Sequence, residues 1–191
     1  MDPRGPRLDD PRTLRIVYHG PGLSGRSSNL RYLFHHSGPD ARGALESHDD
    51  PPGRRLELTV TPPRWTGADG RPLRLHLSTA PGSIDSPAAR ARLLDAADGV
   101  ILVVDSQALR LDADLEALGS LEAALTRQGR SIEATPILYQ YNKRDLPTAL
   151  PVAELDAALG RGARPLVLAS ASIGEGVVES LRGITRRLVG R

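Results

Sequence analysis

The stretch "GPGLSGRSSNL", Gly20 to Leu30, directly follows the apolar run Leu14 to Tyr18. It has the spacing Gly-x-x-x-x-Gly-Lys-[Ser/Thr] of a phosphate-binding loop, except that Arg26 stands where the pattern has lysine. In such a loop, backbone N–H groups and the start of a helix point at phosphate oxygens. The stretch therefore predicts a strand over Leu14–His19, a phosphate site, and a helix over Ser27–Phe34.

The residues of this loop have expected roles in binding phosphate and Mg²⁺. Gly20 and Gly22 are expected to adopt positive φ, and Gly25 to let the backbone approach the phosphates closely. Ser27 is placed to bind Mg²⁺ through its hydroxyl. The loop residues expected to bind nucleotide are Gly20, Gly22, Leu23, Ser24, Gly25, Arg26, Ser27 and Ser28.

A second motif, "NKRD" at Asn142 to Asp145, contains the one lysine among 25 Lys and Arg residues. A carboxylate at Asp145 can accept both the N1–H and the exocyclic amino group of guanine, which adenine lacks at those positions. Asn142 is expected to tie this loop to neighbouring backbone. The stem of Lys143 would cover the base while its ammonium reaches toward the phosphate loop. The alternative is an exposed polar turn before Pro147.

A third segment, Ser170-Ala171-Ser172, follows the next predicted strand. The backbone N–H of Ala171 is expected to donate to the guanine O6 atom, with Ser170 and Ser172 beside it. Small residues before a glycine turn are common, so this inference depends on their position after Asp145.

Apolar runs alternate with amphipathic ones along the rest of the chain. This alternation predicts an α/β domain with a mostly parallel sheet, helices on both faces, and one antiparallel edge strand from a hairpin at Asp69-Gly70. The core face of one long helix is expected to include Leu115 and Leu118. The predicted strands are Leu56–Thr61, Leu73–Leu77, Gly99–Asp105, Pro136–Tyr141 and Pro165–Ala169, and the predicted helices are Pro87–Ala97, Asp112–Gln128, Val152–Leu159 and Val177–Val189.

Length and composition limit the function classes. The 191 residues suit one domain, predicted over residues 13–191 after a disordered arm of residues 1–12. The amino end lacks a signal peptide, so a cytoplasmic protein is expected. Asp2 and the absence of cysteine indicate no membrane anchor. A net charge of +2 and 3% aromatic residues argue against nucleic-acid binding.

Other candidate sites are weak in the sequence. The five histidines show no metal-binding spacing with carboxylate partners. Asp105 and Ser106 have no histidine partner for nucleophilic catalysis.

Taken together, these motifs resemble the small Ras-like GTPases of bacteria that control gliding motility and cell polarity, the MglA type. The resemblance runs from about Leu14 to Leu188, and Thr79-Ala80-Pro81-Gly82 matches the Thr-x-Pro-Gly of that subgroup. It implies a Ras-like P-loop fold that binds GTP or GDP with Mg²⁺ and switches protein effectors, with a Roadblock-type regulator among possible partners. The segments that carry it are "IVYHGPGLSGRSSNLRYLF", "LRLHLSTAPG", "ADGVILVVDSQ", "ILYQYNKRDLP" and "ASIGEGV".

The resemblance also assigns residues near the γ-phosphate. Pro81 and Gly82 would contact nucleotide, and Ser83 follows them where the family has a water-positioning glutamine. Arg54 falls where the family supplies an arginine to the transition state. A plain exposed arginine is the alternative for Arg54.

Three departures from the family pattern concern hydrolysis. Arg26 is a poor substitute for a compact lysine, Ser83 is too short to hold water, and Arg55 aligns with a Mg²⁺-contacting threonine. Guanine recognition is therefore expected to be intact and hydrolysis impaired.

The sequence thus predicts a guanine-nucleotide switch with slow or partner-dependent hydrolysis. Two segments, Gly38 to Arg55 and Thr79 to Ser86, are expected to change order with nucleotide state and to dock partners. The alternatives are a pseudo-GTPase scaffold and a different P-loop NTPase or kinase, and Asp145 argues against the latter.

Overall fold

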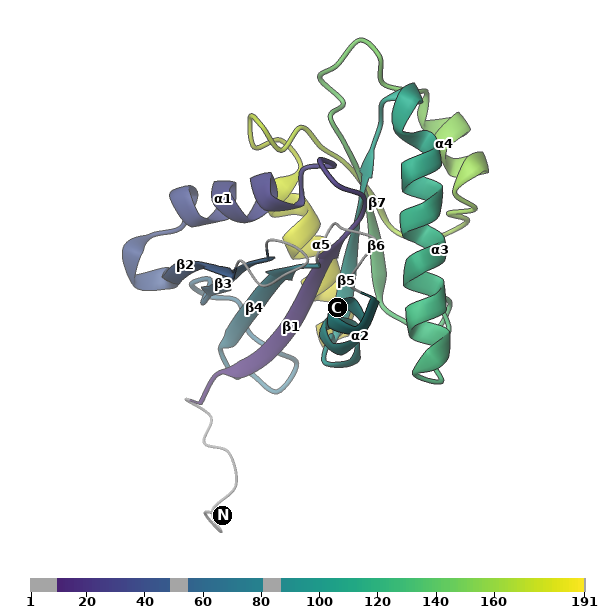
Figure 1. The fold of residues 1–191 in the computed structure, drawn as a ribbon. Helices are drawn as coiled ribbons and strands as arrows, with labels where there is room; N and C mark the ends of the chain where they lie inside the picture. The colour runs from purple at the N-terminus through teal and green to yellow at the C-terminus, as the bar shows by residue number, and fades with distance from the viewer. Residues whose placement is uncertain (1–9, 49–54, 81–86, 191) are drawn as a thin grey trace.

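The computed structural model describes residues 10–48, 55–80 and 87–190, with the side chains of residues 87–90 excepted. Seven strands form one sheet in the order β2-β3-β4-β1-β5-β6-β7, and helices cover both of its faces (Figure 1). The strands are β1 (Arg12–His19), β2 (Arg42–His48), β3 (Arg55–Val60), β4 (Leu73–Thr79), β5 (Gly99–Asp105), β6 (Ile137–Asn142) and β7 (Leu166–Leu168). The helices are α1 (Arg26–His36), α2 (Pro87–Asp95), α3 (Leu111–Arg127), α4 (Val152–Ala158) and α5 (Val177–Val189), with short 3₁₀ turns η1 (Pro39–Ala41) and η2 (Ala108–Arg110).

The sheet confirms the predicted mostly parallel α/β fold. Strands β4, β1, β5, β6 and β7 pair in parallel, while β3 runs antiparallel to both of its neighbours. The hairpin turn lies where expected, with Gly70 at φ +78° and the Asp69 carboxylate accepting from the Arg71 N–H at 3.1 Å. The antiparallel strand β3 is one position away from the edge, because β2 pairs outside it.

Strand β2 lies in a segment that the sequence predicts to be a loop. Its burial pattern shows why, since only Arg42, Leu45 and His48 are partly buried and the other four residues are exposed. Gly43, Ala44 and Glu46 have low strand propensity and no apolar alternation. Pairing with β3, rather than local sequence, therefore makes this segment a strand.

Two apolar layers fix the helices on the sheet. One contains Leu56, Leu58 and Leu77 under α1 and α5, and the other contains Val100 and Leu102 under α2, α3 and α4. All seven residues of β5 are buried, as the continuous apolar run "GVILVVD" predicts for a strand covered on both faces.

Two further predicted details of the fold differ in the structure. Leu115 was expected in the core but is 40% exposed, because the buried stripe of α3 passes instead through Asp114, Leu118, Leu121, Ala124 and Leu125. Strand β1 begins at Arg12, inside the range predicted as an arm. Residues 1–9, and Arg54, Pro81, Gly82 and Ser83 with their segments, lie outside the described residues.

The topology sets where a ligand can bind. Strands β1, β5 and β6 run in parallel and end at His19, Asp105 and Asn142, with the last two paired in register. Ligands bind at the carboxyl ends of strands in open α/β sheets. The phosphate loop and the "NKRD" segment therefore lie together at the carboxyl ends of these strands.

Candidate functional site

The phosphate loop turns sharply between β1 and α1. Gly20 has φ +148°, and a Cβ there would lie 2.2 Å from the Val103 carbonyl oxygen, so only glycine fits. Gly25 has φ +103° immediately before α1. The other positive φ in the loop belongs to Leu23 at +67°, not to Gly22 as predicted. An exposed leucine in this conformation shows that the loop, rather than residue preference, imposes it.

Asn142 ties the phosphate loop to the two other predicted segments. Its side-chain Nδ2 donates to the Ser24 carbonyl at 2.7 Å, and its Oδ1 accepts from the Ala171 N–H at 2.8 Å. A Cβ on Gly25 would lie 2.1 Å from that Nδ2. The backbone contact expected of Asn142 is therefore present.

The same contact corrects the prediction for Ala171. Its N–H, expected to donate to guanine O6, is already bound by the Asn142 amide oxygen. Sequence spacing could not show this, because the partner is 29 residues away.

A pocket of about 290 Å³ lies where these segments meet. Asp145 is exposed at its mouth, and its backbone N–H donates to the Ser170 hydroxyl at 3.1 Å. Within the described ranges, no hydrogen bond or ion pair engages the Asp145 carboxylate. Both of its oxygens are available as acceptors. The lining residues are Leu23, Gly25, Ser28, Asn142, Lys143, Asp145, Leu146, Ala171 and Ser172, of which Leu146 was not predicted.

Lys143 forms an ion pair that the sequence did not indicate. Its Nζ lies 2.6 Å from Oδ2 of Asp105, a carboxylate with no exposed surface. Lys143 adopts φ +64°, and its ammonium thus joins the end of β6 to the end of β5 instead of reaching toward the phosphate loop. The sequence does contain one sign of this ion pair: Asp105 ends a continuous apolar strand, and a buried charge in that place needs a charged partner.

Arg110 is another residue near the pocket that the sequence did not indicate. Its Nη2 donates to the Gly22 carbonyl at 2.6 Å, and its Nε lies 3.6 Å from Asp105 Oδ2. Arginines are scattered throughout the chain, so no local pattern distinguishes this one. The contact fixes the phosphate loop from the side of η2.

Arg26 occupies the first residue of α1 and is buried. Its Nη1 donates to the carbonyl of Ala80, the residue directly after β4. The side chain thus connects the phosphate loop to the start of the Thr79–Ser86 segment. Ser27, the predicted Mg²⁺ ligand, follows it and is partly buried.

Asp114 places a second carboxyl group beside Asp105. It is 2% exposed, and its Oδ1 accepts from the Asp105 backbone N–H at 3.0 Å. Burial, followed by the negative charge of Asp105, raises the pKa of Asp114 from 3.8 to about 8, although the Asp105 N–H acts in the opposite direction. At neutral pH this group therefore remains protonated in the folded state.

We expect Asp114→Asn to flatten the pH dependence of stability. Between pH 4 and 8 the folded protein holds a proton that the unfolded chain has released, so stability falls as pH rises. Asparagine should remove a slope of up to about 1.4 kcal/mol per pH unit. Urea unfolding of both proteins from pH 5 to 8 measures it. Asp112→Asn, an exposed change on the same helix, is the control, and equal slopes in the wild type and Asp114→Asn would disprove the assignment.

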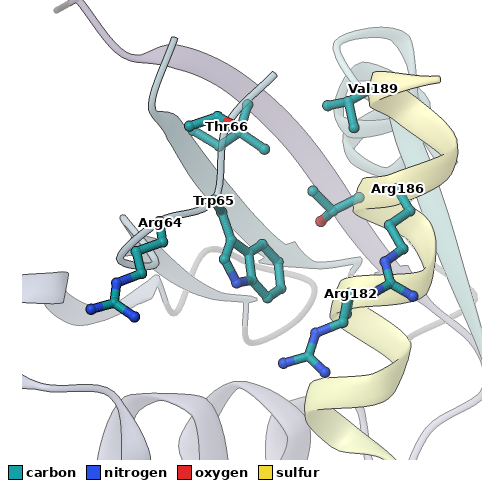
Figure 2. A pocket seen from close by; sticks show the side chains of 8 residues that line it. Arg64, Trp65, Thr66, Arg182, Arg186 and Val189 are labelled. Atoms are coloured by element: carbon teal, nitrogen blue, oxygen red, sulfur yellow. The ribbon is translucent and has the colours of Figure 1, made fainter. Parts of the chain in front are cut away.

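Another concavity, of about 170 Å³, lies between the β3–β4 connection and α5 (Figure 2). Trp65 faces α5, and the Arg182 guanidinium lies 5.8 Å from the centre of its ring. Leu73, also in the lining, pairs with Arg12 at the opposite end of β1 from the phosphate loop. None of the predicted nucleotide-binding residues lines this concavity, so the phosphate-loop pocket is the candidate nucleotide site.

Comparison of the sequence with known proteins shows the family of this chain. No protein-family model matches the chain. The mutual gliding-motility protein MglA of Myxococcus xanthus is 37% identical over 172 residues, which cover 90% of this chain and 88% of that protein. Elongation factor 4 of Thermus thermophilus is 33% identical over 71% of this chain, but that match spans only 21% of the elongation factor.

The described helices carry no membrane span, since none combines sufficient length with sufficient apolar character. The similarity to MglA extends over nearly the whole of both chains and includes the β1–α1 loop and the "NKRD" segment that meet in the pocket. This protein therefore belongs to the MglA family of bacterial Ras-like small GTPases, which are guanine-nucleotide-binding switches.

Proposed function

We propose that this member of the family binds GTP and GDP with Mg²⁺ in the pocket between the phosphate loop and Asp145, and hydrolyses GTP slowly. The observation that carries the proposal is the pocket itself, where Gly25 and Ser28 face Asn142, Lys143 and Asp145. Backbone that would bind phosphate and a carboxylate that would accept from guanine thus line one cavity.

The base side of the site has distinct tasks for its residues. Asp145 would accept the N1–H and amino group of guanine, and the Lys143 stem would pack on the base plane. Asn142 keeps the three segments in place through Ser24 and Ala171. Because the Ala171 N–H is occupied, we assign Ala171 to shaping the pocket, with Ser170 holding Asp145 and Ser172 lining the wall.

The phosphate side combines backbone donors with one hydroxyl. The N–H groups of the loop and the start of α1 would hold the phosphates, and Ser27 would contribute its oxygen to Mg²⁺. The proposed contacts come from Gly20, Gly22, Leu23, Ser24, Gly25, Arg26, Ser27 and Ser28.

The proposal of slow hydrolysis rests on the residues near the γ-phosphate. Arg26 donates one guanidinium nitrogen to the Ala80 carbonyl. A lysine at this position would instead direct its whole charge to the phosphates. The roles of Arg54, Ser83, Pro81 and Gly82 rest on the resemblance alone. Serine lacks the reach to align water, and Arg55 offers no Mg²⁺ ligand.

MglA-type GTPases act with effector proteins. We propose that Gly38 to Arg55 and Thr79 to Ser86 form the nucleotide-dependent docking surface of this protein, and that a Roadblock-type regulator is among its partners. The similarity to a gliding-motility protein supports a role in motility or cell polarity. A switch that responds to GTP would work in the cytoplasm, where that nucleotide is available.

A single-turnover assay with Arg26→Lys tests the hydrolysis proposal. Lysine should tighten triphosphate binding about tenfold, the scale of one better charge-assisted contact. Hydrolysis should remain no faster than about one turnover per hour in both proteins, because the water-positioning and Mg²⁺-binding groups are still missing. Arg31→Lys, an exposed change on α1, controls for the substitution type.

Two outcomes would overturn parts of this proposal. Brisk hydrolysis by the wild type without a partner would show that the departures do not impair catalysis. If neither protein bound GTP or GDP, the pseudo-GTPase scaffold would be the better description.

A further inference from the structure

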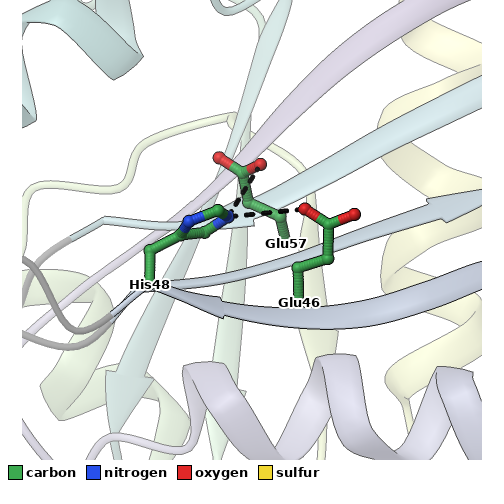
Figure 3. Close-up of side chains that lie close together, drawn as sticks. All are labelled: Glu46, His48 and Glu57. Atoms are coloured by element: carbon green, nitrogen blue, oxygen red, sulfur yellow. Dashed lines mark ion pairs between the residues drawn. The ribbon is translucent and has the colours of Figure 1, made fainter.

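A cluster of potential metal ligands lies away from the nucleotide pocket, on the β2–β3 pair (Figure 3). Glu46 and His48 extend from β2 and Glu57 from β3, and each offers one ligand atom within 4.8 Å of the other two. The spacing rule applied to the sequence missed this cluster. Its residues are two apart on one strand and opposite on the next, a pattern that only strand pairing produces.

Strand register explains why the three side chains meet. Glu46 is directly opposite Glu57, and His48 lies two residues further along β2, on the same side of the sheet. Leu56 and Leu58 face the core under α1, so Glu57 points from β3 to the other face. Two like charges placed opposite each other destabilise a strand pair unless a cation lies between them.

The distances fit a bound ion better than hydrogen bonds. Nε2 of His48 lies 3.5 Å from Oε2 of Glu46 and 3.5 Å from Oε2 of Glu57. This nitrogen is buried, yet it makes no hydrogen bond within the described residues. Ligand atoms about 2.0–2.1 Å from a tetrahedral zinc ion are separated by about 3.3 Å. The two separations from His48 Nε2 are close to that value, and the two glutamate oxygens lie within 4.8 Å of each other.

Arg55 also contacts this cluster, and its position is compatible with an ion. Its Nε lies 3.1 Å from Oε1 of Glu57, the oxygen that does not face His48. Arg55 thus pairs with one Glu57 oxygen, and the other oxygen faces His48. His76 lies farther from this carboxylate, with its Nε2 3.9 Å from Glu57 Oε2.

We propose that Glu46, His48 and Glu57 bind one divalent transition-metal ion, with Zn²⁺ as the best match, and that water completes the coordination. An imidazole with two carboxylates suits zinc, whereas Mg²⁺ prefers oxygen ligands alone. Because β2 is an edge strand held by β3, an ion coordinated by both strands would fasten this edge to the sheet. None of the three residues lines the nucleotide pocket, although Glu46 and His48 belong to the Gly38 to Arg55 segment proposed to respond to nucleotide.

Calorimetric titration of Zn²⁺ into the untagged full-length protein tests this proposal. GDP and excess Mg²⁺ are kept present, so that Zn²⁺ at the phosphates is suppressed. We expect one Zn²⁺ per chain, with affinity at least tenfold weaker in His48→Gln and in Glu57→Gln. His35→Gln, an exposed change on α1 across the sheet, should bind like the wild type.

Two further measurements keep the test decisive. Far-ultraviolet circular dichroism in chelator shows whether each variant is folded, and Glu46→Gln at an exposed position replaces any variant that is not. Hydrogen exchange of the β2 amides should slow on adding Zn²⁺ to the wild type but not to His48→Gln. Absence of Zn²⁺ binding, or equal binding by wild type and His48→Gln, would show that the cluster is only a surface ion network.

Discussion

Replacing Asp145 with asparagine should weaken GDP binding about a hundredfold and shift the preference toward xanthosine diphosphate. Loss of a bidentate, charge-assisted pair to the base corresponds to roughly 2–4 kcal/mol. The amide N–H of asparagine can instead donate to the carbonyl that xanthine carries in place of the guanine amino group. Titration of wild type and variant with GDP, xanthosine diphosphate and ADP measures both effects.

The comparison needs a matched control and has a clear contrary result. Asp95→Asn makes the same chemical change at an exposed position on α2 and should leave all three affinities unchanged. Equal affinity of the wild type for GDP and ADP would remove Asp145 from base recognition. So would a variant that still prefers GDP by the wild-type ratio.

The second large effect concerns the ion pair beneath the pocket. Lys143→Met should lower the free energy of unfolding by about 3 kcal/mol, because it leaves the buried Asp105 carboxylate with a more distant cation. Arg110, 3.6 Å away, keeps the loss from being larger. Urea unfolding at pH 7 measures the change.

A double-mutant cycle separates the ion pair from other roles of Lys143. Lys143→Met combined with Asp105→Asn should recover most of the lost stability, since no buried charge then remains unpaired. Additive losses in the double variant would mean that the two side chains do not depend on each other.

Strands and helices with strong apolar patterns were predictable from the sequence. Strand β5 and helix α5 match their predicted bounds, Gly99–Asp105 and Val177–Val189, because local pattern and tertiary burial agree there. Strand β2 was missed because a weakly patterned segment became a strand through its partner. Its His48 then joined two carboxylates that no sequence spacing relates.

In the candidate site, too, some features were predictable from the sequence and others depend on contacts between distant segments. The motif residues converge on one pocket because parallel strands end at the same edge of the sheet. The contacts between them were not predictable, since Lys143 pairs with Asp105 from 38 residues away and Arg110 reaches Gly22 from 88 residues away. Spacing patterns indicate which residue types a ligand needs. They do not show which donors and acceptors already bind other residues of the protein, as the Ala171 N–H binds the Asn142 side chain.

The most direct test of the central claim is the nucleotide carried by freshly purified protein. Denaturing the protein and separating the released compounds by ion-exchange chromatography should give GDP or GTP at close to one per chain. We expect a guanine site formed by Asp145 and the phosphate loop to retain such a ligand through purification when magnesium is kept present. Recovery of adenine nucleotides, or of none together with no binding of added GDP, would contradict a guanine-nucleotide switch.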